Sequence, residues 1–217
     1  MQKLVVKTAV KTVLILLGII VGAFAIFNFA FPQHMATAME SIGSYDMAVK
    51  YANLHYMYTG DSFVLARCYD DSVLAEDDGS IIYYAEKLLE DKNYQAVCKN
   101  RNDTYNKIYS EQLGKSFDYD LRVRSTLAVS YYNEALKLEG EKRQTYTQKA
   151  IDFASGANGV DRFPYGNPLM TLSMKIVKNS DKWAADIILT VLEGVETTDY
   201  YELEDLKFVK TKLRNVK

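Results

Sequence analysis

The stretch IIYYAEKLL, residues Ile81–Leu89, decides the fold class of this chain. Its Ile, Ala and Leu residues recur at the spacing of one helix face, and Glu86 and Lys87 fall on the other side. Ser80 follows Gly79 and is a suitable helix start, because a serine side chain accepts a hydrogen bond from the first free amides. The stretch therefore predicts an amphipathic α-helix that packs against a neighbour.

The same spacing continues outward in both directions, with no convincing alternating strand. One apolar set is Tyr45, Ala48, Val49, Ala52 and Tyr56; another is Leu127, Ala128, Tyr131, Ala135 and Leu138, expected to face Tyr146, Ala150, Phe153 and Ala154. Further helices are expected over residues 62–75, 94–99, 104–113, 120–138, 142–154, 169–178, 181–192 and 200–216. Turns this short place adjacent helices antiparallel, so the predicted fold class is all-α.

Four segments repeat a related pattern. SIGSYDMAVKYA (residues 41–52) has a glycine turn before a Tyr-x-x-Ala helix, and residues 89–97 and 178–185 echo it, while LAVSYYNEA (residues 127–135) looks like the first helix of such a unit. The pattern resembles, in degenerate form, a tetratricopeptide repeat. The resemblance implies an α-solenoid of α-α hairpins with a concave groove that binds protein.

The array is expected to cover residues 34–199. Residues 200–217 would form a C-terminal capping helix, because Leu203, Leu206, Val209 and Leu213 make one apolar stripe on an otherwise charged segment.

The N-terminal segment predicts a membrane anchor. Residues 12–33 carry no charged side chain and are long enough to cross a bilayer as a transmembrane helix. Residues 1–11 contain Lys3, Lys7 and Lys11, which favours a cytoplasmic N-terminus. We therefore expect a single-pass signal anchor in the lipid bilayer, with the domain that follows lying outside the cytoplasm.

A cleaved signal peptide is the alternative for this segment. Ala36-Thr37-Ala38 is a small-x-small site, and cleavage after Ala38 would release a secreted helical binding protein. Against it, the apolar core of about 19 residues exceeds the roughly 7 to 15 usual for a signal peptide.

Gly18 and Gly22 form a Gly-x-x-x-Gly spacing in the same segment. This spacing places both glycines on one helix face and permits close approach of a second helix. It predicts a homodimer through the N-terminal helix.

The net charge and the cysteine and histidine content indicate which partners and which chemistry to expect. Without the three leading lysines, 23 basic residues face 28 acidic ones, a net charge of −5 that argues against nucleic acid. Cys68 and Cys98 are either two buried thiols or a disulfide. The only histidines, His34 and His55, have no partners at ligand spacing, so no metal or cofactor is expected.

No catalytic signature is present, so we do not expect an enzyme, although an enzyme with an unrecognised site is a further alternative. Asp77-Asp78-Gly79-Ser80 is interpreted as helix-capping turn chemistry. Asn102-Asp103-Thr104 matches a glycosylation sequon, which matters only where exported chains are glycosylated.

Seventeen tyrosines and one irregular loop supply the candidate contacts. Tyrosines can anchor a partner or fill gaps between helices, and Tyr51 and Tyr58 are the candidates for partner binding. Residues 155–168 concentrate the turn-forming residues, and Arg162, Phe163 and Tyr165 there form either a contact site or a plug under the array. The sequence predicts a protein-interaction scaffold or adaptor of unknown partner.

Overall fold

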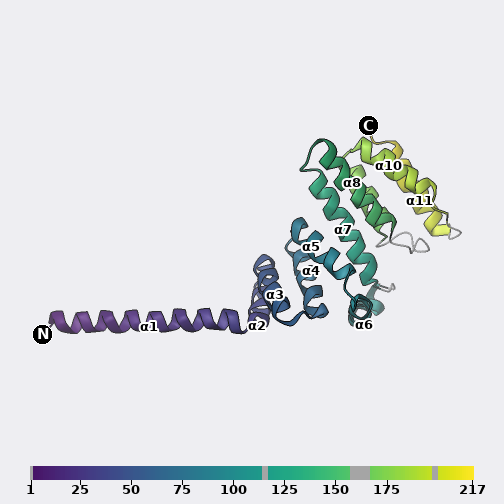
Figure 1. Cartoon of the computed structure of the whole chain (residues 1–217). Helices are drawn as coiled ribbons and strands as arrows, with labels where there is room; N and C mark the ends of the chain where they lie inside the picture. The colour runs from purple at the N-terminus through teal and green to yellow at the C-terminus, as the bar shows by residue number, and fades with distance from the viewer. Residues whose placement is uncertain (1, 114–116, 157–166, 197–199) are drawn as a thin grey trace. The chain divides into compact units, whose positions relative to one another are not determined.

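The computed structural model describes residues 2–113, 117–156, 167–196 and 200–217. Every regular element in these ranges is a helix, so the all-α fold class is confirmed. The chain divides into two compact units, unit 1 (Met1–Asp71) and unit 2 (Ser72–Lys217). Figure 1 labels the helices along the chain.

Unit 1 contains α1 (Gln2–Ala30), α2 (Pro32–Ser41), α3 (Tyr45–Thr59) and most of α4 (Ser62–Leu74), which runs across the boundary. Unit 2 contains the end of α4 and seven further helices. These are α5 (Asp78–Leu89), α6 (Tyr94–Leu113), α7 (Tyr119–Ala135), α8 (Gly140–Ser155), α9 (Pro168–Lys178), α10 (Lys182–Glu193) and α11 (Tyr200–Arg214).

Helix α1 corrects the membrane expectation. Within the part of the chain that the structure describes, no helix is both long and apolar enough to cross a membrane. The transmembrane helix predicted over residues 12–33 is therefore wrong, and with it the signal anchor, the single-pass localisation and the extracytoplasmic placement that followed from it.

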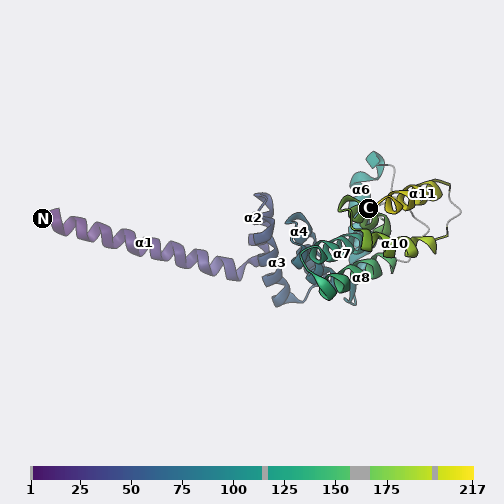
Figure 2. The same cartoon turned by 90° about the horizontal axis from the view of Figure 1, so that it is seen from above.

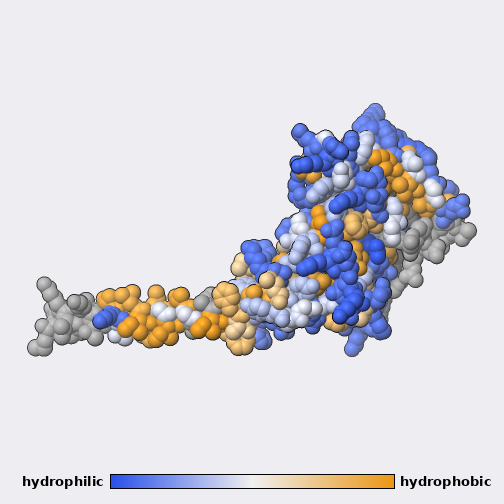
Figure 3. Space-filling view, viewed as in Figure 1, coloured by the Kyte–Doolittle hydropathy of each residue, from blue (hydrophilic) through white to orange (hydrophobic). Residues whose placement is uncertain are grey.

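The boundary of that segment also differs from the prediction. Helix α1 ends at Ala30, and Pro32 begins α2, because the fixed φ of proline suits the first helical position. Several apolar side chains described on α1 are exposed, among them Leu14, Ile15 and Ile20, and Figure 3 shows this apolar surface in orange.

A helical hairpin forms the centre of unit 1. Helices α2 and α3 pack against each other, and Gly43 turns the chain between them with a positive φ of 74° that favours glycine. The buried apolar side chains of this hairpin are three alanines and two larger residues, namely Ala36, Ala48, Ala52, Met35 and Val49. Small residues let the two helices approach closely.

Helix α7 is the centre of unit 2. It packs against α5, α6, α8 and α9, and its buried face includes Leu127, Ala128, Tyr131, Tyr132 and Ala135. The face predicted for α8 is also turned inward, with Ala150 and Ala154 buried.

The C-terminal helices complete unit 2. Helix α9 contacts α10 and α11, and α10 lies beside α11 in both views of the cartoon (Figures 1 and 2). Leu206, Val209 and Leu213 are buried on the inner face of α11, while Leu203 of the same stripe is partly exposed.

Candidate functional site

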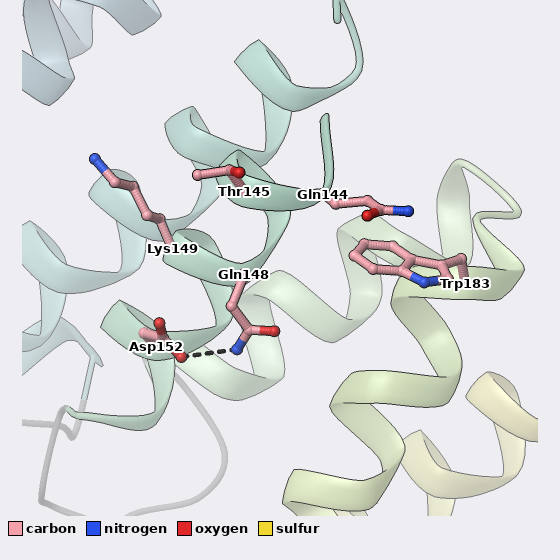
Figure 4. Close-up of a pocket in the computed structure, with 6 residues that line it drawn as sticks. All are labelled: Gln144, Thr145, Gln148, Lys149, Asp152 and Trp183. Atoms are coloured by element: carbon pink, nitrogen blue, oxygen red, sulfur yellow. Dashed lines mark hydrogen bonds between the residues drawn. The ribbon is translucent and has the colours of Figure 1, made fainter. Parts of the chain in front are cut away.

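A shallow groove of about 480 Å³ lies between α8 and α10 in unit 2 (Figure 4). Helix α8 contributes five polar residues, and α10 contributes one large aromatic residue. The lining residues are Gln144, Thr145, Gln148, Lys149, Asp152 and Trp183.

The polar wall of the groove follows from helix geometry. The five α8 residues follow one another at steps of one or three positions, which keeps them on one exposed face of the helix: 144, 145, 148, 149 and 152. The opposite face carries the buried residues Thr147, Ala150, Ile151 and Ala154. Burial of one face therefore turns the other face toward the groove.

Trp183 supplies the aromatic surface of the groove. It is the only tryptophan of the chain and occupies the first turn of α10 with 40% of its surface exposed. Figure 4 shows Gln144 beside the indole and Lys149 pointing away from it. An exposed tryptophan beside a carboxamide offers both apolar contact area and hydrogen-bonding groups.

The start of α10 is fixed by Asp181. Its carboxylate caps the helix by accepting a hydrogen bond from the Ala184 amide at 3.2 Å. It also accepts hydrogen bonds from the Tyr132 hydroxyl of α7 at 3.1 Å and from Nη2 of Arg143 of α8 at 2.7 Å. Three helices are therefore joined at one carboxylate two positions before Trp183.

Electrostatics at Asp181 follow from these partners. Burial alone raises the pKa of this carboxyl, but the hydrogen bonds from Arg143, the Ala184 amide and Tyr132 outweigh burial and leave the pKa below its ordinary value. The pKa of the Tyr132 hydroxyl is raised, mainly by burial and next by the Asp181 charge. Asp181 is therefore a fully charged, well-partnered group at neutral pH.

Other groove residues are held by local contacts. Gln148 Nε2 donates to Asp152 Oδ1 at 2.8 Å, as the dashed line in Figure 4 shows. The Lys149 ammonium lies 5.2 Å from the ring centroid of Tyr131 and 5.9 Å from that of Tyr146. Tyr131 in turn stacks on Phe153. These contacts order α8 without closing the groove.

Of the contact residues predicted from the sequence, the structure describes Tyr51 and Tyr58. Tyr51 and Tyr58 both lie on α3, where Tyr51 is half-buried and Tyr58 is 60% exposed. Met57 and Phe63, next to the α3–α4 turn, are also exposed. Arg162, Phe163 and Tyr165 lie outside the described residues.

The glycine pair and the cleavage site predicted in the N-terminal segment lie on different helices, α1 and α2. A Cβ added at Gly18 or Gly22 would meet no atom within 4 Å, so this face of α1 is uncovered in the structure. The Ala36-Thr37-Ala38 site lies within α2, where Ala36 is buried and Thr37 accepts a hydrogen bond from Arg67.

Both cysteines are buried, Cys68 in unit 1 and Cys98 in unit 2, and the disulfide considered from the sequence stays a prediction. Burial is the largest cause that raises the pKa of the Cys98 thiol to about 11. A thiol protonated at neutral pH is a poor nucleophile, so Cys98 is structural.

Asn102 of the sequon has a structural role. Its side-chain carbonyl accepts a hydrogen bond from the Tyr119 amide at 2.8 Å, and Asn106 similarly accepts one from the Phe117 amide at 2.7 Å. The two asparagines thereby tie α6 to the chain entering α7.

Among the described residues, no cluster of three or more His, Cys, Asp or Glu side chains is suited to hold a metal ion.

Sequence reasoning did not single out the groove. The sequence feature that could have indicated the groove is Trp183, because this lone tryptophan precedes Ala184 and Ala185 and places an aromatic residue on the polar side of a helix start. Its pairing with the exposed face of α8 depends on how α10 folds back, which local periodicity does not encode.

No protein-family model, curated protein or solved structure matches the chain. The tetratricopeptide-like resemblance therefore stays a prediction.

Proposed function

We propose that the chain is a protein-interaction scaffold of tetratricopeptide-like helical hairpins, and that the α8–α10 groove binds an extended peptide segment of a partner protein. The observation that carries this proposal is the exposed indole of Trp183 in a groove lined by α8 side chains. Tryptophan is among the residues that most often dominate binding energy at protein interfaces.

The groove chemistry favours a peptide. The carboxamides of Gln144 and Gln148 both donate and accept hydrogen bonds, so they can pair with the N–H and C=O groups of an extended backbone. The indole provides a flat apolar surface for one side chain of the same peptide.

Preorganisation supports the same function. Asp181 joins α10 to α7 and α8, so the two walls of the groove are held before a partner arrives. A rigid site loses less conformational freedom on binding, which favours affinity. The mild net acidity of the chain is also unsuited to a nucleic acid partner.

The proposal is tested by selecting peptides from a displayed random library on the purified full chain and measuring their affinity by calorimetry. Trp183→Ala should weaken binding by about 30-fold, since loss of an interface anchor is worth about 2 kcal/mol or more. Gln148→Ala should weaken binding by roughly threefold to tenfold through loss of one hydrogen-bonding amide.

Tyr83→Ala is the matched control, because Tyr83 is an exposed aromatic of unit 2 on α5 and does not line the groove. Its affinity should equal that of the wild type, and circular dichroism checks that all variants remain helical. Selected peptides that bind Trp183→Ala as tightly as the wild type would refute the groove as the binding site.

A further inference from the structure

Two acidic side chains share one arginine inside unit 1. Glu40 lies near the end of α2, and Arg67 and Asp71 lie one turn apart on α4. Arg67 Nε donates to Glu40 Oε1 at 2.6 Å, and Arg67 Nη2 donates to Thr37 Oγ1 at 2.8 Å. The guanidinium is thus engaged mainly with α2.

Asp71 is left with too few partners. Its side chain is only 5% exposed, and the Arg67 Nε to Asp71 Oδ2 distance is 3.9 Å, beyond hydrogen-bonding range. Asp71 Oδ2 is buried and has no hydrogen-bond partner. A buried carboxylate without partners is costly, and one guanidinium cannot neutralise two carboxylates.

The second carboxyl group resolves this imbalance. Glu40 Oε1 and Asp71 Oδ2 lie 2.6 Å and 3.9 Å from the same atom, Arg67 Nε, so the two carboxyl groups are neighbours that a hydrogen bond can join. Two carboxyl groups can form such a bond only when one of them carries a proton, because ionised carboxylates only accept.

We propose that Glu40 and Asp71 form a proton-dependent latch between α2 and α4, closed when the two carboxyl groups share a proton and weakened when both are ionised. The charged groups that act on Asp71 are Glu40 from α2 and Arg67 and Asp70 from its own helix. Arg67 remains bound to Glu40 and Thr37 in either state, so deprotonation loosens the contact without removing it.

The titration supports this geometry. Burial, followed by the Glu40 charge, raises the pKa of the Asp71 carboxyl to about 7, and Arg67 opposes the shift. The folded state then holds a proton that the unfolded chain releases near the ordinary pKa of 3.8. The stabilisation is present in full below pH 3.8 and is lost as the pH rises through about 7, so the latch weakens near neutrality.

The latch acts on the N-terminal helices. Helix α2 follows α1 directly, and the Phe27 and Phe31 rings at their junction lie 5.1 Å apart. Helix α2 also packs on α3. A change of pH around neutrality would therefore alter how firmly α2 is held, independently of the α8–α10 groove.

The test is hydrogen exchange, followed by mass spectrometry, of the α2 amides in the full chain. Wild type and Asp71→Asn are compared at the same pH, so that intrinsic exchange rates cancel. Between pH 6 and pH 8, protection in Asp71→Asn relative to wild type should rise about tenfold, because only the wild type loses its proton. Asp46→Asn is the matched control, because Asp46 is an exposed acid of α3 in unit 1 that does not act on Asp71, and it should keep the pH dependence of the wild type.

The proposed latch would be overturned if protection in Asp71→Asn relative to wild type stayed constant between pH 6 and pH 8. Glu40→Gln provides a second variant if Asp71→Asn does not fold. It removes the charge that raises the Asp71 pKa, so the loss of protection should begin at lower pH, and an unchanged profile would also overturn the proposal. In the wild type, the ¹³C resonance of the Asp71 carboxyl should titrate near neutrality, and titration near 4 would contradict it.

Discussion

Asp71 in unit 1 and Asp181 in unit 2 are equally buried, with 5% of each side chain exposed, yet their carboxyl groups behave in opposite ways. Burial raises the pKa of Asp71 to about 7. The pKa of Asp181 lies below its ordinary value because its hydrogen bonds outweigh burial. The number and kind of donors, and not burial alone, decide whether a buried carboxylate holds a charge.

The difference has a structural consequence in each unit. Asp181 receives donors from α7, α8 and its own helix, so it behaves as a permanent joint beside the groove. Asp71 competes with Glu40 for Arg67, so it behaves as a joint that depends on protonation. One arrangement supports a rigid binding site, and the other supports a response to pH.

The largest expected effect is loss of the Asp181 joint. Asp181→Ala removes a helix cap and leaves the Tyr132 hydroxyl buried without an acceptor, which should lower the free energy of unfolding of unit 2 by about 3 kcal/mol. Urea unfolding followed by the fluorescence of Trp183 measures it. Asp186→Ala, on the exposed side of α10, is the control and should change stability by less than about 0.5 kcal/mol. Equal effects of the two variants would contradict the role of Asp181.

Acid should break the same joint. Because the folded pKa of Asp181 is lowered, its stabilising effect is present above pH 3.8 and is lost as the pH falls through the folded pKa. The expected loss is smaller than for Asp181→Ala, since a protonated carboxyl keeps some hydrogen bonds. Urea midpoints measured from pH 6 to pH 2 should fall less steeply for Asp181→Asn than for the wild type. Parallel curves would show that Asp181 does not titrate as described.

Removing one donor should have a moderate effect. Tyr132→Phe deletes a buried hydroxyl that donates to Asp181 and should destabilise unit 2 by about 1 kcal/mol. It should also raise the Asp181 pKa toward the behaviour of Asp71, which a ¹³C carboxyl titration measures. Tyr83→Phe, at an exposed position, should leave both quantities unchanged. If the Asp181 pKa did not rise in Tyr132→Phe, hydrogen-bond donors would not be what sets the charge of this carboxyl group.

The smallest effect belongs to an exposed ion pair on α10. Lys182 Nζ lies 2.6 Å from Asp186 Oδ1, and both side chains are more than half exposed. A double-mutant cycle with alanine should give a coupling of about 0.3 kcal/mol, since solvent screens such pairs. A coupling above about 1 kcal/mol would mean that proximity alone, without burial, sets the strength of ion pairs in this chain.

Local periodicity predicted much of the helical framework. The faces of α5 and α7 follow from apolar spacing, and Ile81, Ala85, Leu127 and Ala128 are buried as that spacing requires. Boundaries were less accurate, because residues 94–99 and 104–113 belong to one helix, α6. Within this helix, Asn102 and Asn106 bind the backbone ahead of α7, a contact that local spacing does not predict.

The candidate site and the acid pair could not be predicted from local pattern. Tyr132 and Asp181 are 49 positions apart, and Arg67 and Glu40 are 27 positions apart. Such contacts depend on how helices cross, and the crossing is set by packing of the whole unit. The membrane helix failed for a different reason: the span predicted over residues 12–33 runs across the junction of α1 and α2, and no described helix is long and apolar enough to cross a membrane.

The most direct measurement is a fluorescence titration of the full chain with a library-selected peptide that lacks tryptophan, because Trp183 is then the only indole in the sample. We expect a saturable shift of the Trp183 emission to shorter wavelength, with the same midpoint as calorimetry, as the partner covers the indole. An unchanged emission at a peptide concentration that saturates the chain by calorimetry would contradict the claim that the α8–α10 groove is the binding site.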